Sequence, residues 1–136
     1  MAIYLYWIGT TLLSALYLSS AALYLARRDY VRQVLSDLGY RAAYLVPVMA
    51  VIKFLAVAAI LSRVSVALSE LAYAGILFHL LLSGMAHLGV GKPRGSIPAV
   101  IGLALLVLSF ATQNAARETP SPYAPAASAI TSTTRN

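Results

Sequence analysis

The sequence has no cysteine and few charged side chains, and each shortage excludes a class of protein. Without cysteine there can be no disulfide framework, no thiolate nucleophile and no thiolate metal site. Charged residues make up 10% of the 136 residues, and just four residues are Asp or Glu, whereas 60% are hydrophobic. A soluble domain needs a more polar surface than this composition can supply. The composition therefore predicts a protein of the lipid bilayer.

The basic residues lie between apolar segments and form no stripe along one folded face. A net charge of +6 could by itself suggest a nucleic-acid partner. Because the arginines flank apolar segments, anionic lipid headgroups are the simpler partner. We therefore expect a bilayer and no nucleic acid.

Four apolar segments are long enough, or nearly so, to cross a hydrocarbon core, which requires about 20 residues. They cover approximately residues 3–26, 42–62, 68–88 and 98–114. The first has no basic start and exceeds the apolar core of a signal peptide, about 7–15 residues, so we expect a retained span. Unpaired backbone groups are costly in lipid and no segment alternates like a barrel strand, so all four should be helices. The predicted fold class is all-α, a polytopic four-helix membrane bundle formed by residues 1–117.

Two segments outside the spans have different characters. Residues 29–38 place apolar side chains at helical spacing opposite arginines, which predicts a short amphipathic helix in the membrane interface after the first span. Residues 118–136 are rich in Pro, Ala, Ser and Thr, which predicts a disordered tail.

The distribution of basic residues predicts the orientation of the spans. The first and third links contain most of the basic residues near the membrane: Arg27, Arg28, Arg32, Arg41, Lys92 and Arg94. The opposite side has Arg63 and Arg117. The positive-inside rule then places links one and three in the cytoplasm and both termini outside. The expected location is a multi-pass position in a membrane, such as the bacterial inner membrane.

Lys53 lies in the middle of the second span and needs a partner there. A lysine at this depth costs roughly 2.5–3.5 kcal/mol, and about 15 Å of helix separates it from either end, beyond the reach of its side chain. Folding spans two and three back on each other near residue 65 brings Lys53 to the depth of His79, with Glu70 roughly 9 Å nearer the link. Two hypotheses remain open: a Lys53–Glu70 ion pair that fixes helix register, or an amine that faces His79 and a pocket.

The polar residues of the third span do not all share one face. At about 100° per residue, Glu70, Tyr73 and His87 lie on one side of the helix and His79 points elsewhere. Glu70 and His87 are some 25 Å apart along the axis, so they cannot form an acid/base pair. Glu70 also suits a capping role near the start of its helix. The spacing of the two histidines matches neither a metal nor a haem site, so we predict no metal.

The first span has a stripe of small and hydroxyl-bearing residues that includes Thr10, Ser14 and Tyr17. Their alternating three- and four-residue spacing predicts a face directed into the bundle. This stripe serves either helix packing or the lining of a ligand pocket.

Four short motifs occur in order along the chain: "LGY" at residues 38–40, Lys53 in an apolar span, "ELAYAG" at 70–75 and "HLGVG" at 87–91. With these motifs the chain resembles the DoxX-like family of small four-helix membrane proteins across nearly all of residues 4–110. It departs from the family pattern in three places: at Arg41, where proline is usual, near Ala56, where glycine is common, and at Lys92, where an acidic residue often stands.

The resemblance implies a limited set of functions. The family takes its name from a subunit of a thiosulfate:quinone oxidoreductase, and other members look like accessory or assembly partners of membrane complexes. Carried over by position, the resemblance implies five candidate residues: Tyr40, Lys53, Glu70, Tyr73 and His87. His79 is added because of its depth alone.

Three functions follow as hypotheses. The first is an intramembrane polar pocket for a lipophilic molecule such as a non-covalently bound quinone, in an oxidoreductase-linked role. The second is a cofactor-free isomerase or hydrolase with acid/base groups. The third is a non-catalytic accessory subunit, or assembly factor, with a partner subunit or in a homo-oligomer. The candidate reactive groups are Lys53, Glu70, His79 and His87; the candidate lining residues are Thr10, Ser14, Tyr17, Tyr40 and Tyr73.

Overall fold

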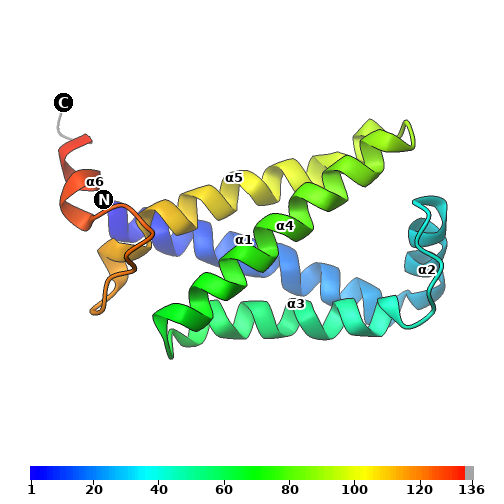
Figure 1. Ribbon diagram of the computed structural model, residues 1–136, viewed down its shortest axis with the longest axis horizontal. Helices are drawn as coiled ribbons and strands as arrows, with labels where there is room; N and C mark the ends of the chain where they lie inside the picture. Colours follow the sequence, from blue (N-terminus) through cyan, green and yellow to red (C-terminus); the bar gives the residue numbers. More distant parts are fainter. Residues whose placement is uncertain (134–136) are drawn as a thin grey trace.

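The computed structural model describes residues 1–133, which form helices joined by short links (Figure 1). Four helical segments are long and apolar enough to cross a membrane. They are α1 (Ala2–Ala26), α3 (Leu45–Ser62), α4 (Val66–Gly89) and the continuous stretch of η1 (Pro93–Ser96), α5 (Ile97–Thr112) and η2 (Gln113–Ala116). The predicted all-α, four-helix membrane bundle is confirmed.

The four spans form a ring in which each helix packs on two neighbours. Helix α1 contacts α3 and α5, and α4 contacts the same two helices. In Figure 1, α4 meets α3 near their connecting link and diverges from it toward the other end of the bundle. Because of this divergence, α3 and α4 do not pack along their whole length as a parallel pair would. The candidate site lies between these two helices.

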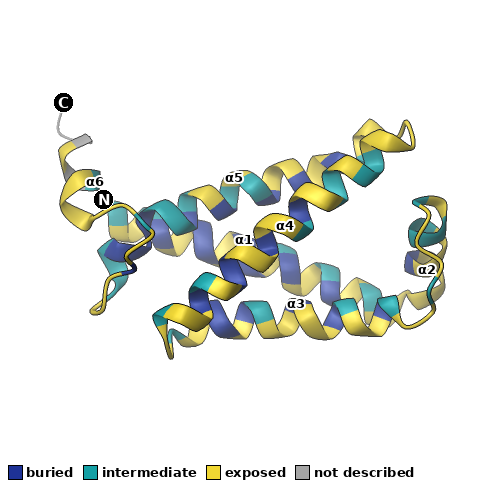
Figure 2. Cartoon of the chain, viewed as in Figure 1, coloured by how far each residue is buried: buried dark blue, intermediate teal, exposed yellow. Residues whose placement is uncertain are grey.

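The interior of the bundle is built from the inward stripe of each helix. On α1 the buried residues include Thr10, Ser14, Tyr17 and Ala21, which recur every three or four positions as the sequence predicts. Gly9 permits a close approach to α5, because a Cβ there would lie 3.1 Å from the backbone nitrogen of Ser109. Figure 2 shows buried positions on the inward faces and exposed positions on the outer ones. The outer positions are largely apolar, as lipid contact requires.

Helix α2 (Arg28–Asp37) follows α1 almost directly and is the predicted amphipathic helix, with Val31 as its buried residue. Gly39 ends it with a φ of +94°, and the Tyr40 amide donates back to the Leu35 carbonyl. Asp37 forms an ion pair of 3.4 Å with Lys92 in the α4–α5 link. The two links that contain most of the basic residues, α1–α3 and α4–α5, therefore lie at one end of the bundle, opposite the two termini (Figure 1). Which end faces the cytoplasm stays a prediction.

The segment after the last span is folded in the structure, in contrast to the disorder predicted for residues 118–136. The Asn114 side chain accepts a hydrogen bond from the Ser121 amide at 2.7 Å and donates to the Ser121 carbonyl at 2.9 Å. Helix α6 (Ala127–Thr133) follows this turn. The buried side chain of Asn114 thus pairs with backbone groups of this segment, and composition alone does not indicate such a partner. Residues 134–136 of the predicted tail lie outside the described residues.

Candidate functional site

Lys53 lies on the inward stripe of α3 and is 4% exposed. The buried residues of this helix include Val46, Ala50, Val57 and Ile60, which recur at three- and four-residue intervals that pass through Lys53. The helix periodicity therefore directs the amine into the bundle at mid-span. The lysine cannot reach the membrane surface along its own helix.

The amine of Lys53 lies among side chains from two other spans. Its Nζ is 3.5 Å from Nε2 of His79 on α4, and Nδ1 of the same histidine is 2.8 Å from the Tyr17 hydroxyl on α1. Nζ also lies 4.7 Å from the ring centroid of Tyr17 and 5.2 Å from that of Tyr24. We call Tyr17, Tyr24, Lys53 and His79 the Lys53 cluster. It joins three helices.

The hydrogen-bond pattern of the cluster leaves donors unused. A charged Lys53 has three N–H donors and no acceptor, so His79 must accept through Nε2 and carry its proton on Nδ1. Nδ1 then donates to the Tyr17 oxygen, and the Tyr17 proton stays free for another acceptor. The two tyrosine rings stabilise the ammonium by cation–π attraction. Within residues 1–133, Lys53 forms no ion pair with a carboxylate.

A groove of about 610 Å³ lies between α3 and α4, and three members of the Lys53 cluster line it: Tyr17, Lys53 and His79. Most of its lining is apolar, from Met49 and Ile52 to Leu68 and Leu71. Small residues on both helices, Ala56, Ala59, Ala72 and Gly75, also line it. Its volume falls in the range of about 300–1,000 Å³ that is typical of small-molecule sites. We call it the α3–α4 groove.

A second polar network lies elsewhere in the bundle and is closed. The Ser109 hydroxyl on α5 is 2.7 Å from Oγ1 of Thr10 and 2.7 Å from the Tyr73 hydroxyl. Thr10 and Ser109 are fully buried, and Tyr73 is nearly so. We call these three residues the Ser109 network. Two of them, Thr10 and Tyr73, were predicted to line a ligand pocket, but neither lines the α3–α4 groove.

Glu70 belongs to a third set of contacts, and within residues 1–133 it forms no ion pair with Lys53, so of the two open hypotheses the structure has the amine facing His79. Oε1 of Glu70 accepts hydrogen bonds from Gln113 at 3.0 Å and from Ser121 at 2.5 Å. Glu70 and His79 are nine residues apart, about two and a half turns, so they face opposite sides of α4. The cap at the start of α4 is Ser65 and not Glu70, because the Ser65 hydroxyl accepts from the Leu68 amide.

Comparison with known proteins identifies the architecture. A sequence model of the DoxX-like family matches residues 8–112. The chain belongs to the DoxX-like family. No curated protein and no solved structure matches it. The matched residues contain every residue of the Lys53 cluster and end at the last residue of α5. Family membership and four spanning helices make this DoxX-like chain an integral multi-pass membrane protein.

Three further candidates are not members of the Lys53 cluster: His87 and Tyr40, which the family resemblance implies, and Ser14, which belongs to the stripe of the first span. His87 is about 12 Å farther along α4 than His79 and packs against Gly95, where an added Cβ would lie 2.2 Å from its Nδ1. That Nδ1 is buried and has no hydrogen-bond partner among the described residues. Tyr40 is about half exposed in the link after α2. Ser14 is buried on the α1 stripe between Thr10 and Tyr17.

Sequence reasoning missed two kinds of partner. Ser109 bonds Thr10 and Tyr73, and Gln113 and Ser121 bond Glu70. None of these three partners was singled out from the sequence. Ser109 carried a signal, since it is a hydroxyl within a strongly apolar span. Ser121 had none, because its position depends on a turn held by Asn114.

Proposed function

We propose that this DoxX-like protein binds a lipophilic small molecule with a carbonyl head group, such as a quinone, in the α3–α4 groove. The main support for this proposal is the Lys53 amine. It is buried at mid-membrane, lacks a carboxylate partner within residues 1–133 and lines an apolar groove of about 610 Å³. A buried amine with unused donors is costly, and a ligand oxygen that accepts from it would recover that cost.

The groove suits a ligand with a polar head and an apolar tail. Lys53 and Tyr17 would donate to the head-group oxygen, while the groove runs about nine residues along α3, from Lys53 to Ser62, for the tail. That stretch corresponds to about 13 Å of helix. His79 connects the two donors, so it can pass a proton between Tyr17 and Lys53.

The proposed role in oxidation and reduction is restricted to binding and proton transfer. Amine, imidazole and phenol groups supply hydrogen bonds and protons at this site. Electrons for a quinone would have to come from a partner subunit that holds a redox group. This requirement supports an accessory position for the chain in an oxidoreductase complex, which is part of the same proposal.

A cofactor-free isomerase is the second candidate, and one observation favours it. Three protonatable side chains, Lys53, His79 and Tyr17, are joined in a chain at the end of an apolar groove. Such a chain can remove a proton at one carbon of a hydrophobic substrate and return it at another. Turnover without any added electron donor would favour this candidate over the binding of a quinone.

Titration of the purified protein in detergent with a soluble quinone analogue tests the main proposal. The expected result is saturable binding that weakens at least about tenfold in Lys53→Met, because a hydrogen bond from a charged donor is lost. Lys92→Met is the matched control, since Lys92 is the other lysine and lies exposed in the α4–α5 link. Equal affinity in wild type and Lys53→Met would remove the amine from the site.

A further inference from the structure

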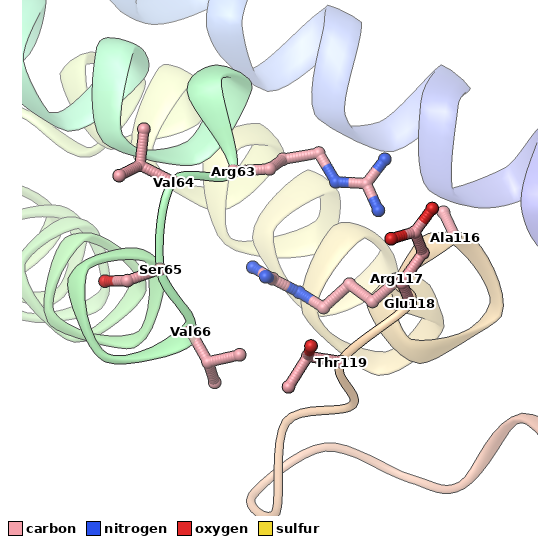
Figure 3. A pocket seen from close by; sticks show the side chains of 8 residues that line it. All are labelled: Arg63, Val64, Ser65, Val66, Ala116, Arg117, Glu118 and Thr119. Atoms are coloured by element: carbon pink, nitrogen blue, oxygen red, sulfur yellow. The ribbon is translucent and has the colours of Figure 1, made fainter.

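A second pocket, of about 590 Å³, lies at the opposite end of α3 from α2, where α3 turns into α4 (Figure 3). It is lined by residues 63–66 of the α3–α4 link and by residues 116–119 after the last span. We call it the link pocket. In Figure 3 the side chains of Arg63 and Arg117 extend from the two sides into the space between these segments.

Arg63 is held in an unusual backbone conformation at the edge of the link pocket. Its φ is +54°, and it is the only non-glycine residue with positive φ among the described residues. An L-residue in this region carries strain that glycine would avoid. The guanidinium lies 5.9 Å from the ring centroid of Tyr6 and 5.8 Å from that of Trp7. Within residues 1–133 it makes no ion pair.

Arg117 faces the same pocket with an unused donor. Its Nε donates to Oε1 of Gln113 at 2.9 Å, which fixes the side chain. Its Nη2 is buried and has no hydrogen-bond partner among the described residues. A buried guanidinium nitrogen without an acceptor is unfavourable, so an anionic oxygen at this point would be stabilising.

The charges around the link pocket favour an anion. Two guanidinium groups, of Arg63 and Arg117, face one lining carboxylate, that of Glu118. Glu70 is not part of the lining, and its Oε1 already accepts from Gln113 and Ser121. The start of α4 also lines the pocket, at Ser65 and Val66, and the positive end of a helix dipole attracts negative charge.

We propose that the link pocket binds a phosphate group and that the guanidinium groups of Arg63 and Arg117 donate hydrogen bonds to it. Paired arginines match the geometry of phosphate oxygens through parallel N–H donors. The pocket lies where α3 ends and α4 begins, at the depth of lipid headgroups. The phosphate therefore belongs either to an anionic phospholipid or to a soluble phosphate compound. Residues 116–119 lie beyond the residues matched by the DoxX-like family.

The test measures binding of two probes to the full chain. One is inorganic phosphate, titrated calorimetrically against protein in uncharged detergent. The other is phosphatidylglycerol, measured as lipid retained by native mass spectrometry after mixing with phosphatidylcholine. We expect at least one probe to bind, and Arg63→Gly and Arg117→Gln each to weaken it at least about tenfold. Binding of free phosphate indicates a soluble ligand, whereas selective retention of phosphatidylglycerol alone indicates a lipid headgroup.

Arg63→Gly separates binding from folding. Glycine adopts positive φ without strain, so this variant should unfold at the wild-type temperature or above it while losing the guanidinium. Arg94→Gln is the control, because Arg94 is exposed at the other end of the bundle. Failure of both probes to bind the wild type would overturn the proposal. So would affinity that is unchanged in a folded Arg63→Gly variant.

Discussion

The Lys53 cluster and the Ser109 network contain similar side chains but differ in whether they line open space. Each joins α1 and α4 to a third span, and each includes a tyrosine hydroxyl near a polar partner at 2.7–2.8 Å. In the Ser109 network each hydroxyl has a buried hydroxyl partner, and none of the three residues lines the α3–α4 groove. The Lys53 cluster keeps unused donors and lines that groove. Under the proposed function, a buried polar group in this bundle indicates a ligand site only where a donor remains free beside open space.

The reason for the difference lies in the packing of the helices. Helix α5 approaches α1 closely at Gly9, so the hydroxyls between them meet without any space for a ligand. Helices α3 and α4 diverge from their link (Figure 1). Small side chains on both helices line the α3–α4 groove. Close packing favours small and hydroxyl-bearing residues, whereas the groove can be lined by a lysine only if the amine finds acceptors.

Breaking the closed network should give the largest change in stability. Ser109→Val leaves the hydroxyls of Thr10 and Tyr73 buried without their shared partner. Each of the two unsatisfied groups costs about 1–3 kcal/mol, so we expect about 2–6 kcal/mol of destabilisation, measured by thermal or denaturant unfolding in detergent. Ser109→Ala should be milder, because a cavity leaves room for water. A wild-type unfolding curve for Ser109→Val would contradict the closed network.

Changing Lys53 should produce the reverse pattern. Lys53→Met removes a buried amine that has no carboxylate partner within residues 1–133, so stability without ligand should rise by about 1–3 kcal/mol. The same variant should lose the stabilisation that a quinone analogue gives to the wild type, measured as the ligand-dependent shift of Tm. If Lys53→Met instead unfolds at lower temperature, the amine is a structural pin between the helices.

The comparison also shows how far sequence reasoning reaches in this chain. Run lengths predict the four spans because a bilayer sets the length of a helix. Folding two antiparallel spans about their link predicts the depth of Lys53 against His79, because helix rise is constant. The rotation of α5 about its own axis was not predicted, because the hydroxyl of Ser109 was not used to orient the helix. Ser109 and its network depend on that rotation.

The position of Glu70 illustrates the same limit. Depth alone allowed it to pair with Lys53, but its side of α4 is set by the helix period and faces Gln113. Its second partner, Ser121, belongs to the segment that composition marked as disordered. Polar composition predicts solvation, and it cannot anticipate a turn that one buried side chain, Asn114, holds in place.

Filling the α3–α4 groove should separate the space from the amine. Gly75 lines the groove, and an added Cβ there meets nothing within 4 Å, so Gly75→Leu should fold and occupy the space of the ligand. We expect quinone-analogue affinity to fall several-fold to about tenfold while Lys53 and His79 stay in contact. Gly89→Leu is the control, since Gly89 is equally open but lies outside the groove. Equal losses in both variants would contradict a site in the groove.

The smallest expected effects come from removing one hydroxyl from each region. Tyr73→Phe should cost about 1 kcal/mol of stability and leave ligand affinity unchanged, because its hydroxyl bonds within the Ser109 network and does not line the α3–α4 groove. Tyr17→Phe deprives His79 Nδ1 of its partner beside the groove, so affinity for a quinone analogue should fall about threefold to tenfold. Unfolding curves and ligand titrations on both variants form a double comparison. If Tyr73→Phe weakens binding as much as Tyr17→Phe, the two regions are coupled through α4, and the closed network supports the site across the helix.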